Sequence, residues 1–301
     1  MQIQLLPWCI LTGCSIAAGI LCFYRADRQK HSDGKSLRLS LLLLCFGLLL
    51  GALFARGLWV LFRWFMHPQF FSFRLDELSW YGGVAGTILA AALSARLAGR
   101  KVCDTLNTFA PVGAMLVAAF RFGEGFIGSL GFGRYVDKGV FFPITVEVIY
   151  DAYYSEYYWA VFMLEGFLAL IAMVFSIFQK QKADRFLRTL FWICLPQILC
   201  ESLRIQSIRW LFIRAEQLIS FLICEGILIL YAVLRNPRKL RSWIPVIVGL
   251  AVCGLAVAVE FALDAKILID GHALPRLLLY SILAAGLSVM AVAEHKSRLV
   301  R

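Results

Sequence analysis

Nine apolar runs, separated by short polar segments, constrain the fold of this chain more than any other feature. A helix needs about 17–25 residues to cross a bilayer, and the runs have roughly that length. Charged residues make up only 16% of the 301 positions, against about 25% in soluble domains. The sequence therefore predicts an all-α fold, a polytopic integral membrane protein with about nine transmembrane helices. These are expected at residues 4–24, 39–61, 82–99, 105–127, 158–178, 187–203, 216–234, 244–263 and 275–293.

Lysine and arginine set the expected orientation, because these residues gather in cytoplasmic loops. With the N-terminus outside, the inner segments carry 19 of the 30 lysines and arginines and the outer segments carry 10, while Arg121 lies inside a run. We therefore expect the N-terminus outside and the C-terminus in the cytoplasm. The formal net charge of +11 follows from this bias, so the sequence gives no reason to predict a nucleic-acid partner.

Two further features leave this class unchanged. The nine cysteines form no CxxC pair, so the sequence predicts neither a zinc site nor a disulfide framework. The letters "LTGC" at 11–14 resemble a lipobox, but no basic residue precedes them and the apolar run continues past Cys14. We therefore interpret the first run as a transmembrane helix and not as a cleaved signal peptide.

The stretch "RFGEGFIGSLGFGR", residues 121–134, places charge and glycine at the end of the fourth run. An arginine at the centre of a spanning helix costs about 2.5–3.5 kcal/mol on insertion scales. Glu124 follows Arg121 on the same helical face, so the two side chains can form a packed ion pair. Alternatively, glycines such as Gly123 and Gly133 let the backbone approach a ligand, and arginine with exposed N–H groups suits a headgroup phosphate. The residues alone leave both interpretations open.

Two other polar sets flank apolar runs. The letters "LSWYGGVAG" put Tyr81 at the outer mouth of the third run, where a tyrosine of the interfacial aromatic belt is the simpler interpretation. The letters "CESLRIQSIRWLFIRAEQ" pair Glu201 with Arg204 at i, i+3 spacing, and Arg209 and Arg214 follow. Arginines on the outer side run against the charge bias, so they indicate either a functional use or ordinary headgroup contacts.

In this order, the three stretches resemble the prolipoprotein diacylglyceryl transferase family. The family's third helix opens with S-F-H-G-G, two hydrophobic residues and G, where this chain has "SWYGGVAG". Its signature GR-I-G-N-F-x-N-G-E-x-W-G-R is similar to residues 121–134, with one apparent extra residue, and "PW", "MLEG" and "ESLR" also match. The resemblance covers roughly residues 5–234. It implies a diacylglyceryl-transferase-like seven-helix membrane domain at 1–234 and a C-terminal extension with two additional transmembrane helices at 235–301.

The resemblance implies an enzyme of lipoprotein biogenesis in the bacterial plasma membrane. Such an enzyme transfers diacylglyceryl from phosphatidylglycerol, or a related anionic phospholipid, to the lipobox cysteine thiol of a prolipoprotein signal peptide. Glycerol phosphate leaves, and the reaction needs no metal and no cofactor. Residue by residue, the resemblance assigns binding of the substrate phosphate to Arg121, Arg204, Gly123, Gly133 and Arg134.

The chain departs from the family pattern at the polar positions that would handle protons. The histidine before "GG" is replaced by Tyr81, whose phenol has a reference pKa of about 10. The signature asparagine is replaced by Glu124, and the second asparagine and the glutamate fall on Gly128, Ser129 or Leu130. We therefore expect Tyr81 and Glu124 to be the catalytic residues. The alternatives are a non-catalytic relative that binds lipid or lipoprotein, and a transferase with a changed acceptor. An unrelated transporter would show two related halves, which this sequence does not.

Overall fold

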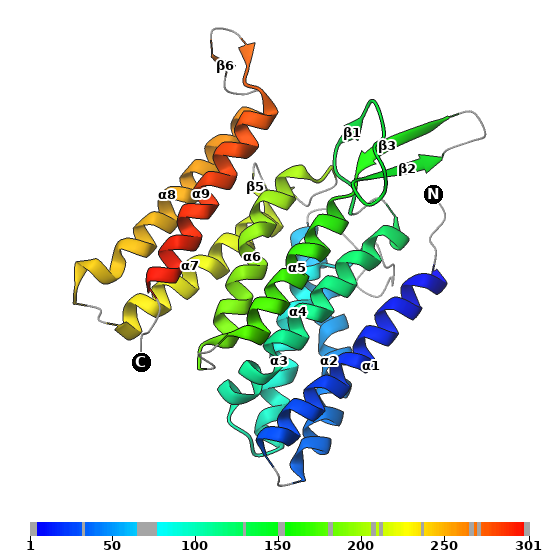
Figure 1. Ribbon diagram of the computed structural model, residues 1–301, viewed down its shortest axis with the longest axis vertical. Helices are drawn as coiled ribbons and strands as arrows, with labels where there is room; N and C mark the ends of the chain where they lie inside the picture. The colour runs from blue at the N-terminus through cyan, green and yellow to red at the C-terminus, as the bar shows by residue number, and fades with distance from the viewer. Residues whose placement is uncertain are drawn as a thin grey trace. The chain divides into compact units, whose positions relative to one another are not determined.

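Nine helices and seven short strands form the regular structure of the described residues in the computed structural model (Figure 1). The structure describes residues 5–31, 34–64, 77–128, 131–149, 154–179, 183–205, 209–210, 213–235, 238–264, 268–269 and 272–297. The helices are α1 (Leu5–Lys30), α2 (Lys35–Phe62), α3 (Trp80–Leu97), α4 (Val102–Ile127), α5 (Val161–Phe178), α6 (Arg185–Leu203), α7 (Ala215–Arg235), α8 (Leu240–Leu263) and α9 (Arg276–Ser297). The strands are β1 (Tyr135–Val136), β2 (Thr145–Ile149), β3 (Ser155–Trp159), β4 (Arg209–Trp210), β5 (Ile213–Arg214), β6 (Leu268–Ile269) and β7 (His272–Ala273).

Eight of these helices are long and apolar enough to cross a membrane. Helix α3 has 18 residues, as many as α5, and is the one described helix outside this set. Helix α6 continues through Pro196. The chain is therefore a multi-pass helical membrane protein, as the sequence predicts. The number of crossings and the orientation stay predictions.

The chain divides into two compact units, and the division runs through α6. Unit 1 comprises Met1–Ile193 and Leu203–Ile208, and unit 2 comprises Cys194–Ser202 and Arg209–Arg301. The predicted domain boundary after residue 234 concerns the reach of the family resemblance, and it stays a prediction.

In unit 1, helices α2 and α3 pack closer than ordinary side chains would allow. A Cβ atom at Gly82 would lie 2.2 Å from the carbonyl oxygen of Phe54, and one at Gly86 would lie 2.2 Å from that of Leu50. Small residues at such positions let two backbones meet, which is the usual device for helix packing in membranes. Gly82 and Gly86 therefore join α3 to α2 at two positions about one helical turn apart.

The apolar core of unit 1 lies where α1, α2, α3 and α4 meet. Phe23, Leu39 and Ala90 are fully buried there, and the rings of Phe23 and Phe109 meet edge to face with centroids 5.9 Å apart. Helix α4 contacts both α1 and α5, which lie on either side of it in Figure 1. This arrangement places the glycine-rich C-terminal end of α4 between two other helices.

A three-stranded antiparallel sheet, in the order β1-β3-β2, lies beyond the ends of α4 and α5 (Figure 1). Its register pairs Tyr135 and Val146 with Tyr158 from opposite sides. Aromatic and β-branched residues dominate these strands, as strand propensity requires. The sequence analysis predicts only helices, so this sheet and the two short hairpins β4–β5 and β6–β7 are additions to the predicted all-α fold.

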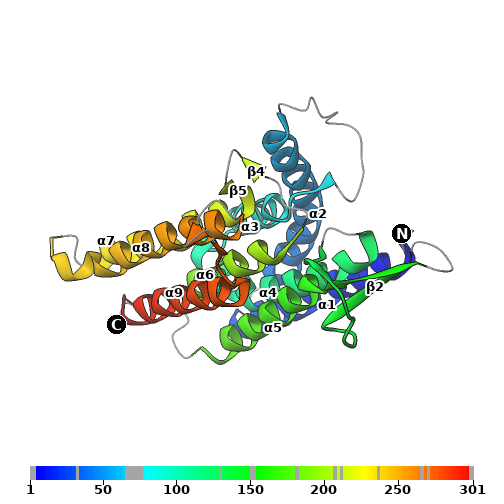
Figure 2. The same ribbon diagram turned by 90° about the horizontal axis from the view of Figure 1, so that it is seen from above.

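In unit 2, helices α7, α8 and α9 lie side by side (Figures 1 and 2). Leu228, Val252 and Leu283, one from each helix, are buried. A Cβ atom at Gly249 of α8 would lie 2.0 Å from a carboxylate oxygen of Glu225 on α7. Glycine on α8 therefore makes room for an acidic side chain in the middle of α7.

Candidate active site

Three of the predicted site residues come together in unit 1 as part of a four-residue network. Arg121 and Glu124 lie near the C-terminal end of α4, and Arg204 follows the last residue of α6. The fourth member is Glu165, which lies in the second turn of α5. We call Arg121, Glu124, Glu165 and Arg204 the Arg–Glu cluster.

Glu124 bridges the two arginines of the cluster. Its Oε1 accepts a hydrogen bond from Arg121 Nη1 at 2.5 Å, and its Oε2 accepts one from Arg204 Nη2 at 2.6 Å. Charge-assisted bonds of this kind are about twice as strong as those between neutral groups. The carboxylate of Glu124 therefore occupies the position between the two guanidinium groups.

Glu165 holds the same two arginines from the α5 side. Arg204 Nε donates to Glu165 Oε1 at 3.0 Å, and a second donor, Arg204 Nη2, also bonds to this carboxylate. Arg121 Nε lies 3.2 Å from Glu165 Oε2. The cluster thus has two positive and two negative groups, which is how buried charges offset the cost of leaving water.

Burial separates the two carboxylates of the cluster. The side chains of Arg121, Glu165 and Arg204 are 1%, 2% and 6% exposed, whereas that of Glu124 is 15% exposed. Glu124 is therefore the member with most access from outside the protein.

Aromatic residues at the start of α3 support the cluster. The guanidinium carbon of Arg121 lies 4.5 Å from the ring centroid of Trp80, a cation–π distance. Trp80 in turn meets the ring of Tyr81 edge to face, with centroids 4.6 Å apart. Tyr81 is only 3% exposed, so it is a buried residue and not an exposed belt tyrosine. Trp80 links it to the cluster.

The glycines of the signature stretch serve close packing. A Cβ atom at Gly123 would lie 3.1 Å from the indole of Trp8 on α1, and one at Gly131 would lie 2.6 Å from Phe162 on α5. The backbone of Gly133 forms a β-bridge with Arg204, and its N–H donates to the Trp159 carbonyl at 2.7 Å. These glycines bring α1, α5 and the α6 end against the charged end of α4.

Arg134 is not bonded to the members of the Arg–Glu cluster among the described residues. Its carbonyl oxygen accepts from the N–H of Trp159 at 3.1 Å, and its side chain is half-buried. Within the part of the chain that the structure describes, this side chain forms no ion pair. Gly128 has a positive φ of 137°, and the candidate positions Ser129 and Leu130 lie outside the described residues.

Sequence reasoning missed Glu165 and Trp80 as site residues, although both lie in the quoted stretches "MLEG" and "SWYGGVAG". The signal for Glu165 is an acidic residue inside an otherwise apolar run, which is costly and therefore a functional candidate. A second buried ion pair was also missed: Arg56 Nη1 lies 2.7 Å from Glu77 Oε2, and Arg56 is 2% exposed. Its partner arrives from a distant segment, which spacing along one helix cannot reveal.

This arrangement is a buried network of two arginines and two glutamates at the end of α4, and a comparison with protein families identifies the class of the protein. A family model described as prolipoprotein diacylglyceryl transferase matches residues 1–233. The chain belongs to the prolipoprotein diacylglyceryl transferase family. The match confirms the resemblance read from the three polar stretches. A search of the curated proteins gives no match to the chain.

Membership of the prolipoprotein diacylglyceryl transferase family fixes the coarse function. The family is one of transferases that act in lipoprotein biosynthesis, with lipid and prolipoprotein substrates at a membrane. The Arg–Glu cluster lies entirely within the matched residues, whereas α8 and α9 lie beyond them.

Proposed function

We propose that this protein transfers the diacylglyceryl group of phosphatidylglycerol, or of a related anionic phospholipid, to the lipobox cysteine of a prolipoprotein in the bacterial plasma membrane. The observation that supports the proposal is that Glu124 bridges Arg121 and Arg204 with one oxygen each. A lipid phosphate offers the same charge and the same oxygen spacing to two guanidinium groups.

In this proposal the lipid phosphate replaces Glu124 between the arginines. Glu165 stays in place, because it is almost fully buried and holds Arg204 through two donors. The exchange keeps the charge of the site nearly unchanged, so it avoids the cost of leaving two buried cations unpaired. The phosphate is then held by two positive groups, which stabilise the charge that grows on it as it leaves.

The displaced Glu124 carboxylate provides the base. It accepts the proton of the lipobox thiol, and the thiolate is the nucleophile. The sulfur attacks the glyceryl carbon that carries the phosphate oxygen, so an S–C bond forms and the C–O bond breaks. The electron pair of that bond goes to the phosphate oxygen, and glycerol phosphate leaves. In this scheme Glu124 thus neutralises the two arginines before the lipid binds and accepts the thiol proton afterwards.

We assign supporting roles to the other candidate residues. Tyr81 packs against Trp80, which in turn lies against the guanidinium of Arg121. In this scheme Tyr81 supports Arg121 through Trp80, and Glu124, not the Tyr81 phenol, takes the thiol proton. Gly123 and Gly133 bring α1 and the Arg204 backbone against α4. Arg134, with its side chain outside the cluster, is available to a phosphate approaching along the half-buried surface.

The test is a transfer reaction with purified protein, phosphatidylglycerol and a lipobox peptide, read by mass spectrometry of the peptide cysteine. We expect a diacylglyceryl adduct from the wild type, and a loss of at least about 100-fold in rate for Arg121→Ala, comparable to the loss of one transition-state donor. Glu124→Gln should also lose turnover but keep lipid binding. Arg96→Ala, an exposed arginine at the end of α3, is the matched control and should leave the rate unchanged.

A second candidate function, a non-catalytic lipid-binding relative, has one observation in its favour. The four charges of the cluster balance one another without any ligand, as in a packed ion network. That function predicts no adduct in the wild type while anionic lipid still co-purifies. If the Arg121→Leu, Glu124→Gln double variant then folds and binds lipid as the wild type does, the cluster is structural and the transferase proposal is wrong.

A further inference from the structure

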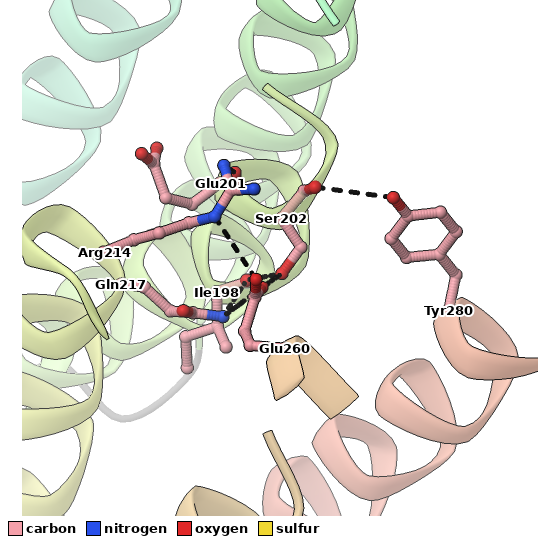
Figure 3. Close-up of polar contacts among 7 residues, drawn as sticks. All are labelled: Ile198, Glu201, Ser202, Arg214, Gln217, Glu260 and Tyr280. Carbon is pink, nitrogen blue, oxygen red and sulfur yellow. Dashed lines mark hydrogen bonds and ion pairs between the residues drawn. The ribbon is translucent and has the colours of Figure 1, made fainter. Parts of the chain in front are cut away.

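A second buried polar network lies in unit 2 and centres on Glu260, a residue of α8 beyond the family match. Its Oε1 accepts hydrogen bonds from the hydroxyl of Ser202 and, at 3.3 Å, from Gln217 Nε2. Its Oε2 lies 3.3 Å from Arg214 Nε. Figure 3 shows the carboxylate between the end of α6 and the start of α7.

The groups around Glu260 also bind one another. Arg214 Nη1 donates to the carbonyl of Glu201 at 2.5 Å, and Gln217 Nε2 donates to the Ser202 hydroxyl and to the Ile198 carbonyl, both at 3.2 Å. The last carbonyls of a helix have no partner within the helix. In α6 the Glu201 carbonyl, one of these last carbonyls, is satisfied by Arg214 of β5, while Gln217 of α7 bonds to the Ile198 carbonyl about one turn earlier. These bonds tie the end of one helix to the start of the next.

Helix α9 adds one more contact to the same turn of α6. The hydroxyl of Tyr280 donates to the Ser202 carbonyl at 3.4 Å, and Figure 3 shows it reaching this carbonyl from the side away from Arg214. Both helices beyond the family match therefore contribute a polar side chain to the end of α6.

The network lies at the base of the α6–α7 connection, residues 203–213. Ser202 directly precedes this segment and Arg214 directly follows it, and one carboxylate bonds to both. Arg204 is the second residue of the connection, and its backbone is bridged to Gly133 in unit 1. Glu260 therefore bonds to the residues on both sides of the stretch of chain that contains Arg204.

A carboxylate in this position is costly to keep. Glu260 is 14% exposed and Arg214 5% exposed in their side chains, and a buried ion pair is often no more stable than apolar residues of similar volume. Its best-attested use is to fix one arrangement among several. A carboxylate suits this use here, because its two oxygens can accept from three donors on two separate segments.

We propose that Glu260 is a positioning residue that clamps the two ends of the α6–α7 connection and so holds the segment bearing Arg204. The effect on catalysis rests on the proposed function, whereas the effect on the connection does not.

The first experiment measures amide hydrogen exchange of residues 203–214 in the full-length protein, without any substrate. We expect exchange in this segment to be at least about 10-fold faster in Glu260→Leu and in Glu260→Gln, since opening of a segment speeds as its tethers are lost, and near wild-type rates in Glu260→Asp. Glu225→Gln, a carboxylate of α7 outside the network, is the matched control and should change nothing in 203–214.

Glu260→Gln keeps the size and one acceptor oxygen, so it decides the question if Glu260→Leu does not fold. Unchanged exchange in folded Glu260→Gln would overturn the proposal.

The second experiment separates positioning from general stability. If the wild type forms the lipobox adduct, Glu260→Gln should raise KM for phosphatidylglycerol at least about fivefold per folded molecule, with a smaller change in kcat, and Glu260→Asp should restore it. An unchanged KM with less folded protein would show a merely structural role and overturn the positioning assignment. If the wild type forms no adduct, the proposed function has failed, and the exchange experiment still decides whether the clamp exists.

Discussion

At the scale of single residues, the two glutamates of the Arg–Glu cluster differ in burial and in how they bind the arginines. Glu124 bridges the arginines but is partly exposed, while Glu165 is buried and bonded to Arg204 through two donors. An exposed bridging group can leave, because water or a ligand can replace it. A buried one cannot, since its loss leaves cations unpaired in a region without water. In the proposed function, Glu124 is therefore the exchangeable counter-ion of the two arginines and Glu165 the fixed one.

This difference predicts the stability of two matched variants. Glu165→Gln removes a buried negative charge that faces Arg121 and Arg204, and breaking a buried pair in this way costs about 3–5 kcal/mol. Glu147→Gln makes the same chemical change at an exposed position of β2 and should be neutral within about 0.5 kcal/mol. Thermal unfolding of both variants in detergent measures the difference. Equal midpoints would mean that Glu165 carries no net charge in the folded protein.

How much of the site could be predicted depends on the separation of its residues along the chain. The pairing of Arg121 with Glu124 follows from their i, i+3 spacing, and the structure has it. The contact between Glu124 and Arg204 joins residues 80 positions apart, and no spacing rule reaches that far. Arg204 is a candidate from its place among the outer arginines and from the family resemblance, but its i, i+3 spacing pairs it with Glu201 and not with Glu124; Glu165 is not a candidate at all. Contacts between residues close in sequence can be predicted from their spacing, whereas contacts between side chains of different helices depend on how the helices pack.

At the scale of elements, the close approach of α2 and α3 leaves different amounts of space for a side chain at two glycines of α3. A Cβ atom at Gly86 would meet the Leu50 carbonyl at 2.2 Å, whereas one at Gly83 has nothing nearer than the Ala55 Cβ at 3.8 Å. Gly86→Ala should therefore destabilise the protein by about 1–3 kcal/mol or more, as overpacking does. Gly83→Ala should be neutral or stabilising by up to about 1 kcal/mol, because alanine is the better helix former.

Unfolding midpoints of the two alanine variants in one detergent measure this pair, and each serves as the control for the other. Both changes add the same methyl group to the same helix, so effects on insertion or expression cancel. Equal loss of stability in both variants would mean that α3 does not approach α2 as closely as described.

Helices were the easier elements to predict. The expected run at 187–203 became α6 at Arg185–Leu203 in spite of Pro196, because a long apolar run in a membrane has to satisfy its backbone internally. The sheet β1-β3-β2 was not predicted, because its aromatic residues also fit an interfacial belt. A β-sheet and an interfacial belt can have the same aromatic composition. Only the pairing of segments distant in sequence, such as Val136 with Tyr157, distinguishes the sheet from the belt.

At the scale of the whole molecule, the open question is whether α3 crosses the membrane. Its composition alone leaves it out of the eight apolar helices, but its contacts within unit 1 span nearly the whole of α2. The N–H of Ser79, just before α3, donates to the carbonyl of Ala55, and Gly99, just after it, lies near Lys35 Nζ. Ala55 and Lys35 are 20 residues apart on α2, about 30 Å at 1.5 Å per residue. That is the thickness of the hydrocarbon core, so we expect α3 to return across the same layer that α2 is expected to cross.

Nine crossings make a sharp prediction about the two sides of the membrane. An epitope tag inserted after Lys138, which precedes the sheet strand β2, should be accessible to antibody or protease in intact spheroplasts. A tag at the C-terminus should become accessible only after the membrane is opened, because an odd number of crossings from an outer N-terminus ends inside. Failure of α3 to cross would reverse both results together, which no change in a later helix can do. The excess of lysine and arginine on the expected inner side, 19 against 10, favours the first outcome, since a reversed chain would place that excess outside.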